Sequence, residues 1–307
     1  MRSFFLFFFI ISMSLSAQTE ISSSKYQIVF GSFRNGAFAS SIFSISVNGE
    51  DLKLISKHKE GKPNCLDPKV SPDFKRIIFA RGAAGHQTSI WSMKADGTDE
   101  KRLTGVINRR FTNNAKASFS SDGTQFTYGS NISHDANIFL GNINNDDARN
   151  LTLNKGKNKS AEWHPTENKI IFNSDREGIY KVYLLDLAQN TPQLITPKDM
   201  EASLPSWSPN GDYILFSGST DGKQYDLYKI KANGTELTQI TDTPLLSERD
   251  GLYSPDSKYI VFEAKPADSP RNFERSIYII EIKTGKVKKL TESKFHDFSA
   301  SWILVEE

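Results

Sequence analysis

The five histidines are the side chains of this sequence best suited to metal binding or proton transfer. Metal sites usually combine such ligands at short, recognisable spacings. Here the histidines are far apart, and no His-Glu-x-x-His motif occurs. His86, His134 and His296 would form a metal site only if the fold brought their imidazoles together. We favour the alternative that they are ordinary polar loop residues, and we expect no metal or other cofactor.

Other catalytic motifs are also missing from the sequence. The string closest to a nucleophile elbow, Gly218–Gly222, has its serine in the wrong position, and no Walker sequence is present. The acidic stretch Asn144–Asp147 lacks the spaced ligands of a calcium loop and is typical of a solvated hairpin tip. The sequence therefore predicts a protein that is not an enzyme.

Charge and composition narrow the class of partner. The 38 basic and 36 acidic side chains leave a net charge of only +2, which gives no electrostatic reason to expect nucleic acid or an anionic membrane as the main partner. Hydrophobic residues make up 37% of the chain and include 21 Phe, so the chain is too apolar to be disordered. We expect a folded protein with a large core.

The N-terminal residues have the layout of a secretory signal peptide. Arg2 precedes the apolar run Phe4–Leu15, and small residues up to Ala17 follow it. That run is shorter than the roughly 20 apolar residues that a membrane-spanning helix needs. Cys65 is the only cysteine, so neither an internal disulfide nor a lipid anchor at the cleavage point is expected. We predict a signal peptide over residues 1–17 and a periplasmic or secreted protein.

The elements that must position any functional side chain come from a unit repeated six times. Each unit contains an apolar run, such as Ile77-Ile78-Phe79, that ends near an aromatic anchor. The anchors recur at intervals of 44 to 49 residues and are Phe30, Phe79, Tyr128, Phe172, Phe216 and Phe262.

Turn signals divide each repeat into four short strands. A turn such as Ser208–Gly211 precedes the anchor strand, and a pair such as Ile195-Thr196 closes the repeat. No helical period runs through any repeat. A four-stranded sheet recurring at this spacing is typical of a propeller blade.

The two ends of the sequence predict how the ring closes. The first repeat lacks its first strand, and Ser299–Leu304, which contains Trp302, reads as a first strand with nothing after it. We expect this C-terminal strand to complete the N-terminal blade, which removes exposed sheet edges. The predicted fold is an all-β, six-bladed β-propeller of four-stranded antiparallel blades over residues 25–307, after a short segment at 18–24.

The repeat resembles that of the TolB family. The pattern from Trp207 to Ser217 and the segment Phe172–Asp186 carry the similarity, which extends over residues 25–304. The resemblance implies a TolB-like propeller. The chain departs from the family in one respect, because TolB has an additional α/β domain before its propeller, and here the first strand follows the predicted signal peptide. The family's Tol–Pal role and its site residues are therefore not carried over to this sequence. Oligogalacturonate lyases share the repeat and are metal enzymes, so a polysaccharide lyase is the alternative function.

Long, irregular loops are expected on one face of the propeller, which we call the loop face. They are the loops between the second and third strands of a blade and those between blades: Ser32–Ser40, Lys57–Asp67, Gly105–Lys116, Asp242–Arg249 and Ala264–Arg275. Variable loops on a rigid scaffold commonly carry function. We predict that this face binds an envelope or extracellular protein, peptide or glycan, and that the protein is a monomer. The candidate contact residues are Asp67, Arg109, Arg110, Lys116, Lys159, Arg249, Asp250 and Arg271.

Overall fold

The computed structural model describes residues 25–34, 39–56, 64–82, 87–105, 112–133, 135–153, 155–270, 274–292 and 294–305. These residues form 24 strands, and they include no helix and so none that could cross a membrane. The predicted signal peptide at 1–17 and the segment at 18–24 lie outside the described residues.

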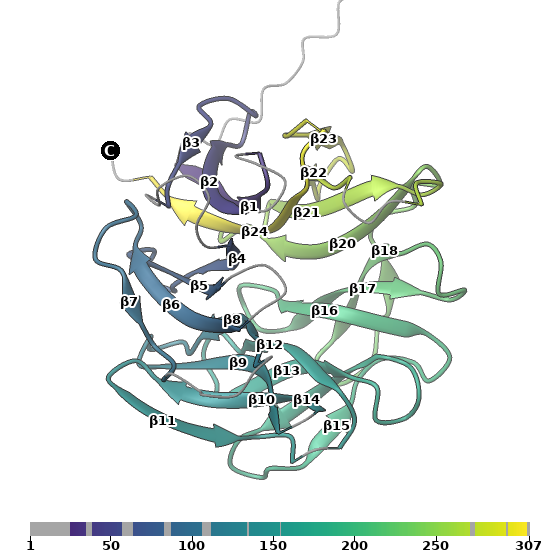
Figure 1. The fold of residues 1–307 in the computed structure, drawn as a ribbon. Coiled ribbons are helices and arrows are strands. Elements are labelled where there is room, and N and C mark those ends of the chain that lie inside the picture. The colour runs from purple at the N-terminus through teal and green to yellow at the C-terminus, as the bar shows by residue number, and fades with distance from the viewer. Residues whose placement is uncertain are drawn as a thin grey trace, which may run out of the picture.

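The strands form six antiparallel, four-stranded sheets arranged as blades around a central axis (Figure 1). The first three blades, from the innermost strand outward, are as follows. Blade one contains β24 (Asp297–Leu304), β1 (Tyr26–Ser32), β2 (Ser41–Ser46) and β3 (Lys53–Leu54). Blade two contains β4 (Asn64–Val70), β5 (Arg76–Gly82), β6 (Thr88–Lys94) and β7 (Lys101–Arg102). Blade three contains β8 (Asn114–Phe119), β9 (Gln125–Ser133), β10 (Asp135–Asn142) and β11 (Asn145–Asn150).

The other three blades follow the same order. Blade four contains β12 (Asn158–Trp163), β13 (Lys169–Ser174), β14 (Lys181–Asp186) and β15 (Pro192–Leu194). Blade five contains β16 (Glu201–Trp207), β17 (Tyr213–Ser219), β18 (Asp226–Lys231) and β19 (Thr238–Gln239). Blade six contains β20 (Leu246–Tyr253), β21 (Tyr259–Pro266), β22 (Ser276–Glu281) and β23 (Val287–Lys289). The predicted six-bladed propeller is confirmed.

The C-terminal strand closes the ring as predicted. In blade one, β24 pairs antiparallel with β1, so that Trp302 lies opposite Ile28 and Leu304 opposite Tyr26. At the other end of this pair, both carboxylate oxygens of the fully buried Asp297 accept hydrogen bonds from Arg34, at 2.9 and 3.0 Å. The two ends of the described chain are therefore joined by a strand pair and an ion pair.

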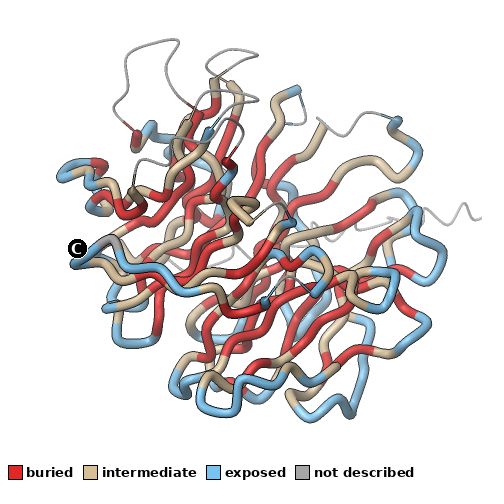
Figure 2. Tube along the Cα trace, turned by 60° about the horizontal axis from the view of Figure 1, so that its bottom comes forward, coloured by how far each residue is buried: buried red, intermediate tan, exposed pale blue. Residues whose placement is uncertain are grey.

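The aromatic anchors form the centre of each blade. All six are buried, and burying such a side chain contributes about 1.5 to 3 kcal/mol. Each anchor lies directly opposite a second ring on the next strand, as Phe172 does with Tyr183 and Phe216 with Tyr228. Those two ring pairs are stacked, with centroids 5.9 and 5.8 Å apart. The buried residues accordingly follow the strands, and the exposed residues gather at the turns (Figure 2).

The short polar motifs of the repeat satisfy backbone groups. The hydroxyl of the Thr or Ser that closes each repeat accepts a hydrogen bond from an amide of the third strand, as Thr196 does from Val182 at 3.1 Å. The serine that begins most turns between the first two strands accepts a bond from the amide five residues later, as Ser208 does from Tyr213 at 2.9 Å. In blade four His164 replaces this serine, and its Nδ1 accepts a bond from the Glu167 amide at 3.0 Å. A histidine there is a turn residue.

Candidate functional site

Each innermost strand contains one residue with a left-handed backbone at the same position. The φ angles lie between 49° and 54°, and the residues are Asp67, Lys116, Ser160, Leu204, Asp250 and Ser299. The pairing register with the neighbouring strand shifts at this point in all six blades. Such β-bulges bend a strand and redirect its side chains. Because residues of four different types share one backbone geometry at these six positions, the ring imposes the conformation, and the sequence determines which side chains lie on the axis.

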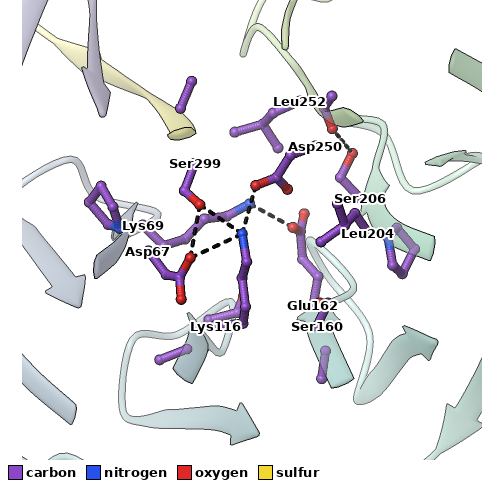
Figure 3. Close-up of a pocket in the computed structure, with 17 residues that line it drawn as sticks. Asp67, Lys69, Lys116, Ser160, Glu162, Leu204, Ser206, Asp250, Leu252 and Ser299 are labelled. Carbon is purple, nitrogen blue, oxygen red and sulfur yellow. Dashed lines mark hydrogen bonds and ion pairs between the residues drawn. The ribbon is translucent and has the colours of Figure 1, made fainter. Parts of the chain in front are cut away.

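Lys116 of blade three occupies the axis and contacts residues of blades one, two and six (Figure 3). Its Nζ lies 2.7 Å from Oδ2 of Asp250 and 3.2 Å from Oδ1 of Asp67. It also donates a hydrogen bond to Oγ of Ser299 at 2.7 Å, and Ser299 in turn donates to Asp67 at 2.9 Å. We call Asp67, Lys116, Asp250 and Ser299 the upper plug.

The charges of the upper plug stabilise one another. Burial disfavours the charge on Lys116, but the carboxylates of Asp250 and Asp67 outweigh it and raise the pKa of the ammonium group above its ordinary value. Burial also acts against the carboxylate of Asp250, yet the neighbouring Lys116 keeps its pKa below the ordinary value. Both groups are therefore charged at neutral pH.

A second ion pair lies deeper along the axis. Nζ of Lys69 is 2.6 Å from Oε2 of Glu162, two blades away, and the other carboxylate oxygen accepts a bond from the Trp207 amide at 3.3 Å. A cavity of about 50 Å³ is lined by residues of the upper plug and of this second ion pair. A water molecule needs about 10 to 15 Å³ measured in this way, so the cavity has room for only a few waters. The centre of the propeller is thus closed by side chains.

Above the upper plug, a basin of about 440 Å³ opens toward the loop face. Its floor includes Asp67, Lys116 and Ser299, so the plug forms the bottom of the basin. Its sides consist of a charged wall, formed by Arg249, Glu263 and Arg275, and an aromatic wall, formed by Phe33, His296 and Phe298. We call this hollow the mouth basin.

The charged wall comes from blade six. Arg275 forms an ion pair with Glu263, which is itself buried. Glu263 lies directly opposite Arg249 in the β20–β21 pair. The guanidinium carbon of Arg249 lies 3.7 Å from the centre of the Tyr225 ring. Burial raises the pKa of Glu263, with Arg275 opposing the shift, and burial lowers the pKa of Arg249.

The aromatic wall is a cluster of three rings. The centroid of Phe33 lies 5.8 Å from that of His296 and 5.7 Å from that of Phe298. His296 and Phe298 are 5.2 Å apart. Burial, together with the nearby Arg275, lowers the pKa of His296 to about 4. The imidazole is therefore neutral at physiological pH and belongs to an uncharged wall.

The structure brings some of the predicted contact residues together and separates others. Asp67, Lys116 and Asp250 meet in the upper plug, and Arg249 lies in the mouth basin. Lys159 is exposed, with its Nζ 5.3 Å from the centre of the Tyr180 ring, and does not line the basin. The remaining predicted residues, Arg109, Arg110 and Arg271, lie outside the described residues.

The histidine cluster considered for metal binding is described only in part. His296 belongs to the aromatic wall, and His86 and His134 lie outside the described residues. Within the ranges that the structure describes, no group of three or more His, Cys, Asp or Glu side chains could hold a metal ion.

Sequence reasoning missed Ser299, Glu263 and Arg275. Ser299 had a usable signal, because it immediately precedes Ala300, the small residue that aligns with Ala117 and Gly251 in the other inner strands. By the same alignment, Ser160 and not Lys159 is the axial residue of blade four. Glu263 and Arg275 had no such signal, since they come from other strands and loops of the blade.

Comparison with known proteins relates the chain to one family and to curated TolB proteins. The family model for the dipeptidyl peptidase IV (DPP IV) N-terminal region matches residues 97–271. The Tol-Pal system protein TolB of Francisella tularensis subsp. mediasiatica is 28% identical over 182 residues. That match covers 57% of this chain and 40% of the relative, so the chain corresponds to less than half of that protein.

Solved structures share the fold at low sequence identity. TolB from Acinetobacter baumannii superposes with a TM-score of 0.75 at 18% identity, covering 90% of this chain and 66% of that one. An oligogalacturonate lyase in complex with manganese superposes with a TM-score of 0.60 at 12% identity, covering 87% of this chain and 74% of that one. These two likenesses establish the TolB-like propeller fold and do not separate binding from catalysis.

Proposed function

We propose that this chain, which belongs to the family of the dipeptidyl peptidase IV N-terminal region, is an exported, non-enzymatic binding protein of the cell envelope. Its mouth basin and the surrounding loop face would bind a protein partner, with a glycan as the other ligand class. The sequence match to the Tol-Pal system protein TolB supports a role among envelope proteins. The signal-peptide pattern at residues 1–17 supports export.

One observation carries this proposal: the mouth basin is a preformed hollow whose floor is locked by ion pairs. Lys116 holds Asp67 and Asp250 together beneath it, so a ligand would enter from the loop face and stop at the plug. Preformed hollows with apolar walls and a few fixed charges are typical of binding sites. The walls here combine arginines with aromatic rings, which are residue types enriched at protein interfaces.

A polysaccharide lyase is the second candidate, favoured by the shared fold of the manganese-bound oligogalacturonate lyase. His296 is the described histidine at the basin, and its ring packs between Phe33 and Phe298. An imidazole held in that way is poorly placed to act as a metal ligand. Incubation of the purified protein with oligogalacturonate and Mn²⁺ should form no unsaturated product, and its formation would favour the lyase.

Site-specific crosslinking tests the binding proposal directly. A photoreactive phenylalanine analogue in place of Phe33 would sample the mouth basin in living cells. The same analogue in place of Phe74 is the matched control, because Phe74 is also half-buried and lies in the Ser71–Phe74 turn at the end of β4 away from the basin. We expect one protein to be crosslinked through position 33 and not through position 74. Identical crosslinks from both positions, or none from either, would contradict the proposal.

A further inference from the structure

The mouth basin contains three cations, and two of them have carboxylate partners. Lys116 is bound to Asp67 and Asp250, and Arg275 is paired with Glu263. Arg249 differs: within the described ranges no carboxylate lies within ion-pair distance of its guanidinium. The nearest candidate in the strand register, Glu263, is directed to Arg275 instead.

The surroundings of Arg249 make this arrangement costly without a ligand. The side chain is half-buried, and burial acts against its charge. The neighbouring Arg275 adds a like charge, which Glu263 and Glu201 offset only in part from beyond ion-pair distance. A cation held in this environment gains more from an incoming anion than an exposed arginine does, because the surrounding water that would otherwise solvate it has been partly removed.

The orientation of Arg249 suits a planar anion. The guanidinium carbon of Arg249 lies over the Tyr225 ring, 3.7 Å from its centre, and the N–H groups that Tyr225 does not engage can donate hydrogen bonds to a ligand. The planar fork of an arginine matches the two oxygens of a carboxylate. The preferred anion is therefore a carboxylate.

The aromatic wall indicates which chemical group of the ligand lies beside that carboxylate. Phe33 and His296 stack against each other with an angle of 25° between their rings, and Phe298 is only 8% exposed. The faces of these rings pack against one another, so they do not offer an open face on which a sugar ring could stack. They favour a small apolar side chain beside the carboxylate.

We propose that the mouth basin binds a carboxylate of the partner's polypeptide, flanked by an apolar side chain, and that Arg249 is the residue that holds the carboxylate. The carboxylate is either the C-terminus of the partner or an Asp or Glu side chain. This inference rests on the proposed function and specifies the chemistry of its ligand.

Titration of the full-length mature protein with small probes tests the inference. The probes are N-acetyl-leucine, which has a terminal carboxylate, N-acetyl-glutamyl-leucinamide, which has a side-chain carboxylate, and N-acetyl-leucinamide, which has none. The readout is the NMR signal of the Arg249 Nε–H group. We expect saturable shifts with at least one of the first two probes and none with the third, and the responding probe identifies the source of the carboxylate.

Variants separate the arginine's role from general effects. Arg249→Gln should weaken binding of the responding probe about tenfold or more, as expected for a lost charge-assisted hydrogen bond. Arg149→Gln, at an exposed position on the outermost strand of blade three, should leave binding unchanged. If Arg249→Gln does not fold, Arg249→Lys keeps the charge without the planar fork and should weaken binding several-fold. Equal binding of all three probes, or binding of digalacturonate alone, would overturn the inference.

The crosslinking experiment distinguishes a failure of this inference from a failure of the proposed function on which it rests. If the responding carboxylate probe blocks the crosslink at position 33, both proposals are supported. If the crosslink forms but no probe competes with it, the partner binds without the carboxylate contact, and only the inference fails. If no crosslink forms although a probe binds Arg249, the proposed protein partner is wrong.

Discussion

The ammonium group of Lys116 and the carboxylate of Asp250 lie 2.7 Å apart on the axis of the propeller, although they come from opposite blades, three and six. Each of the two is itself the left-handed residue of a β-bulge, and this bulge recurs in all six innermost strands. A contact across the ring connects blades that are not neighbours. The plug, like the Lys69–Glu162 pair, therefore adds cross-links to the contacts between neighbouring blades.

Lys116→Met should destabilise the protein by about 1 to 3 kcal/mol, because it leaves Asp67 and Asp250 partly buried without their cation. The free energy of unfolding in urea is the measurement. Lys283→Met, at an exposed position, is the control and should change stability by less than about 0.5 kcal/mol. Adding Asp250→Asn to Lys116→Met should restore part of the loss. A double variant less stable than the sum of the two single changes would refute this account of the plug.

The repeat made most of the fold predictable from the sequence. The spacing of anchors such as Phe172 and Phe216 and the turn signals defined the blades, and the unmatched strand around Trp302 indicated how the ring closes. The anchors and turn signals are local and recur along the chain, so a wrong assignment in one blade is corrected by the others.

The site was predicted less completely because its contacts are not local. Asp67, Lys116 and Asp250 were predicted as contact residues of the loop face, but which of them pair depends on the ring bringing residues 134 positions apart into contact. A shift of one residue also separates the axial Ser160 from the exposed Lys159. The aromatic wall joins Phe33 to His296 from the two ends of the chain, and no sequence pattern links them.

Asp297→Asn should destabilise the ring closure by about 3 kcal/mol, because Arg34 would lose the buried carboxylate that receives two of its hydrogen bonds. Thermal unfolding followed by circular dichroism measures the loss. Asp199→Asn, an exposed aspartate between blades four and five, is the matched control and should behave like the unmodified protein. Equal melting temperatures for the two variants would show that the pair does not stabilise the closure.

His296 should make the protein less stable in mild acid. Its pKa is about 4 in the fold, against an ordinary value of 6.5, so between these pH values the unfolded chain binds a proton that the folded chain does not. The stability from the neutral imidazole is complete above about pH 6.5 and declines as the pH falls toward 4, by up to about 3 kcal/mol. Urea unfolding at several pH values measures it.

The matched variant for this pH effect is His296→Gln, which cannot titrate in that range. It should differ from the unmodified protein by a constant amount above pH 7, owing to the lost ring contacts with Phe33 and Phe298. Below pH 6 the difference should shrink, since only the unmodified protein loses stability through this histidine. Parallel stability curves for the two proteins from pH 7 to pH 4.5 would contradict the shifted pKa.

His164 can be tested as a structural turn residue through the glycine that faces it. Gly211 and Gly123 occupy the same turn position in blades five and three, with φ angles of +77° and +70°. A Cβ on Gly211 would lie 2.2 Å from Nε2 of His164, whereas a Cβ on Gly123 would meet nothing within 4 Å. Gly123→Ala should therefore cost about 1 kcal/mol, the strain of a left-handed alanine.

Gly211→Ala should cost about 1 to 3 kcal/mol more than Gly123→Ala, because the histidine ring must also move away from its edge-on contact with Trp207. His164→Ser restores the serine found at the start of the other turns and removes the ring. In that background Gly211→Ala should cost no more than Gly123→Ala does. Urea unfolding of the four variants measures these free-energy differences. If the extra loss of stability from Gly211→Ala persists in the His164→Ser background, the crowding has another source, and His164 is not the residue that requires a glycine at position 211.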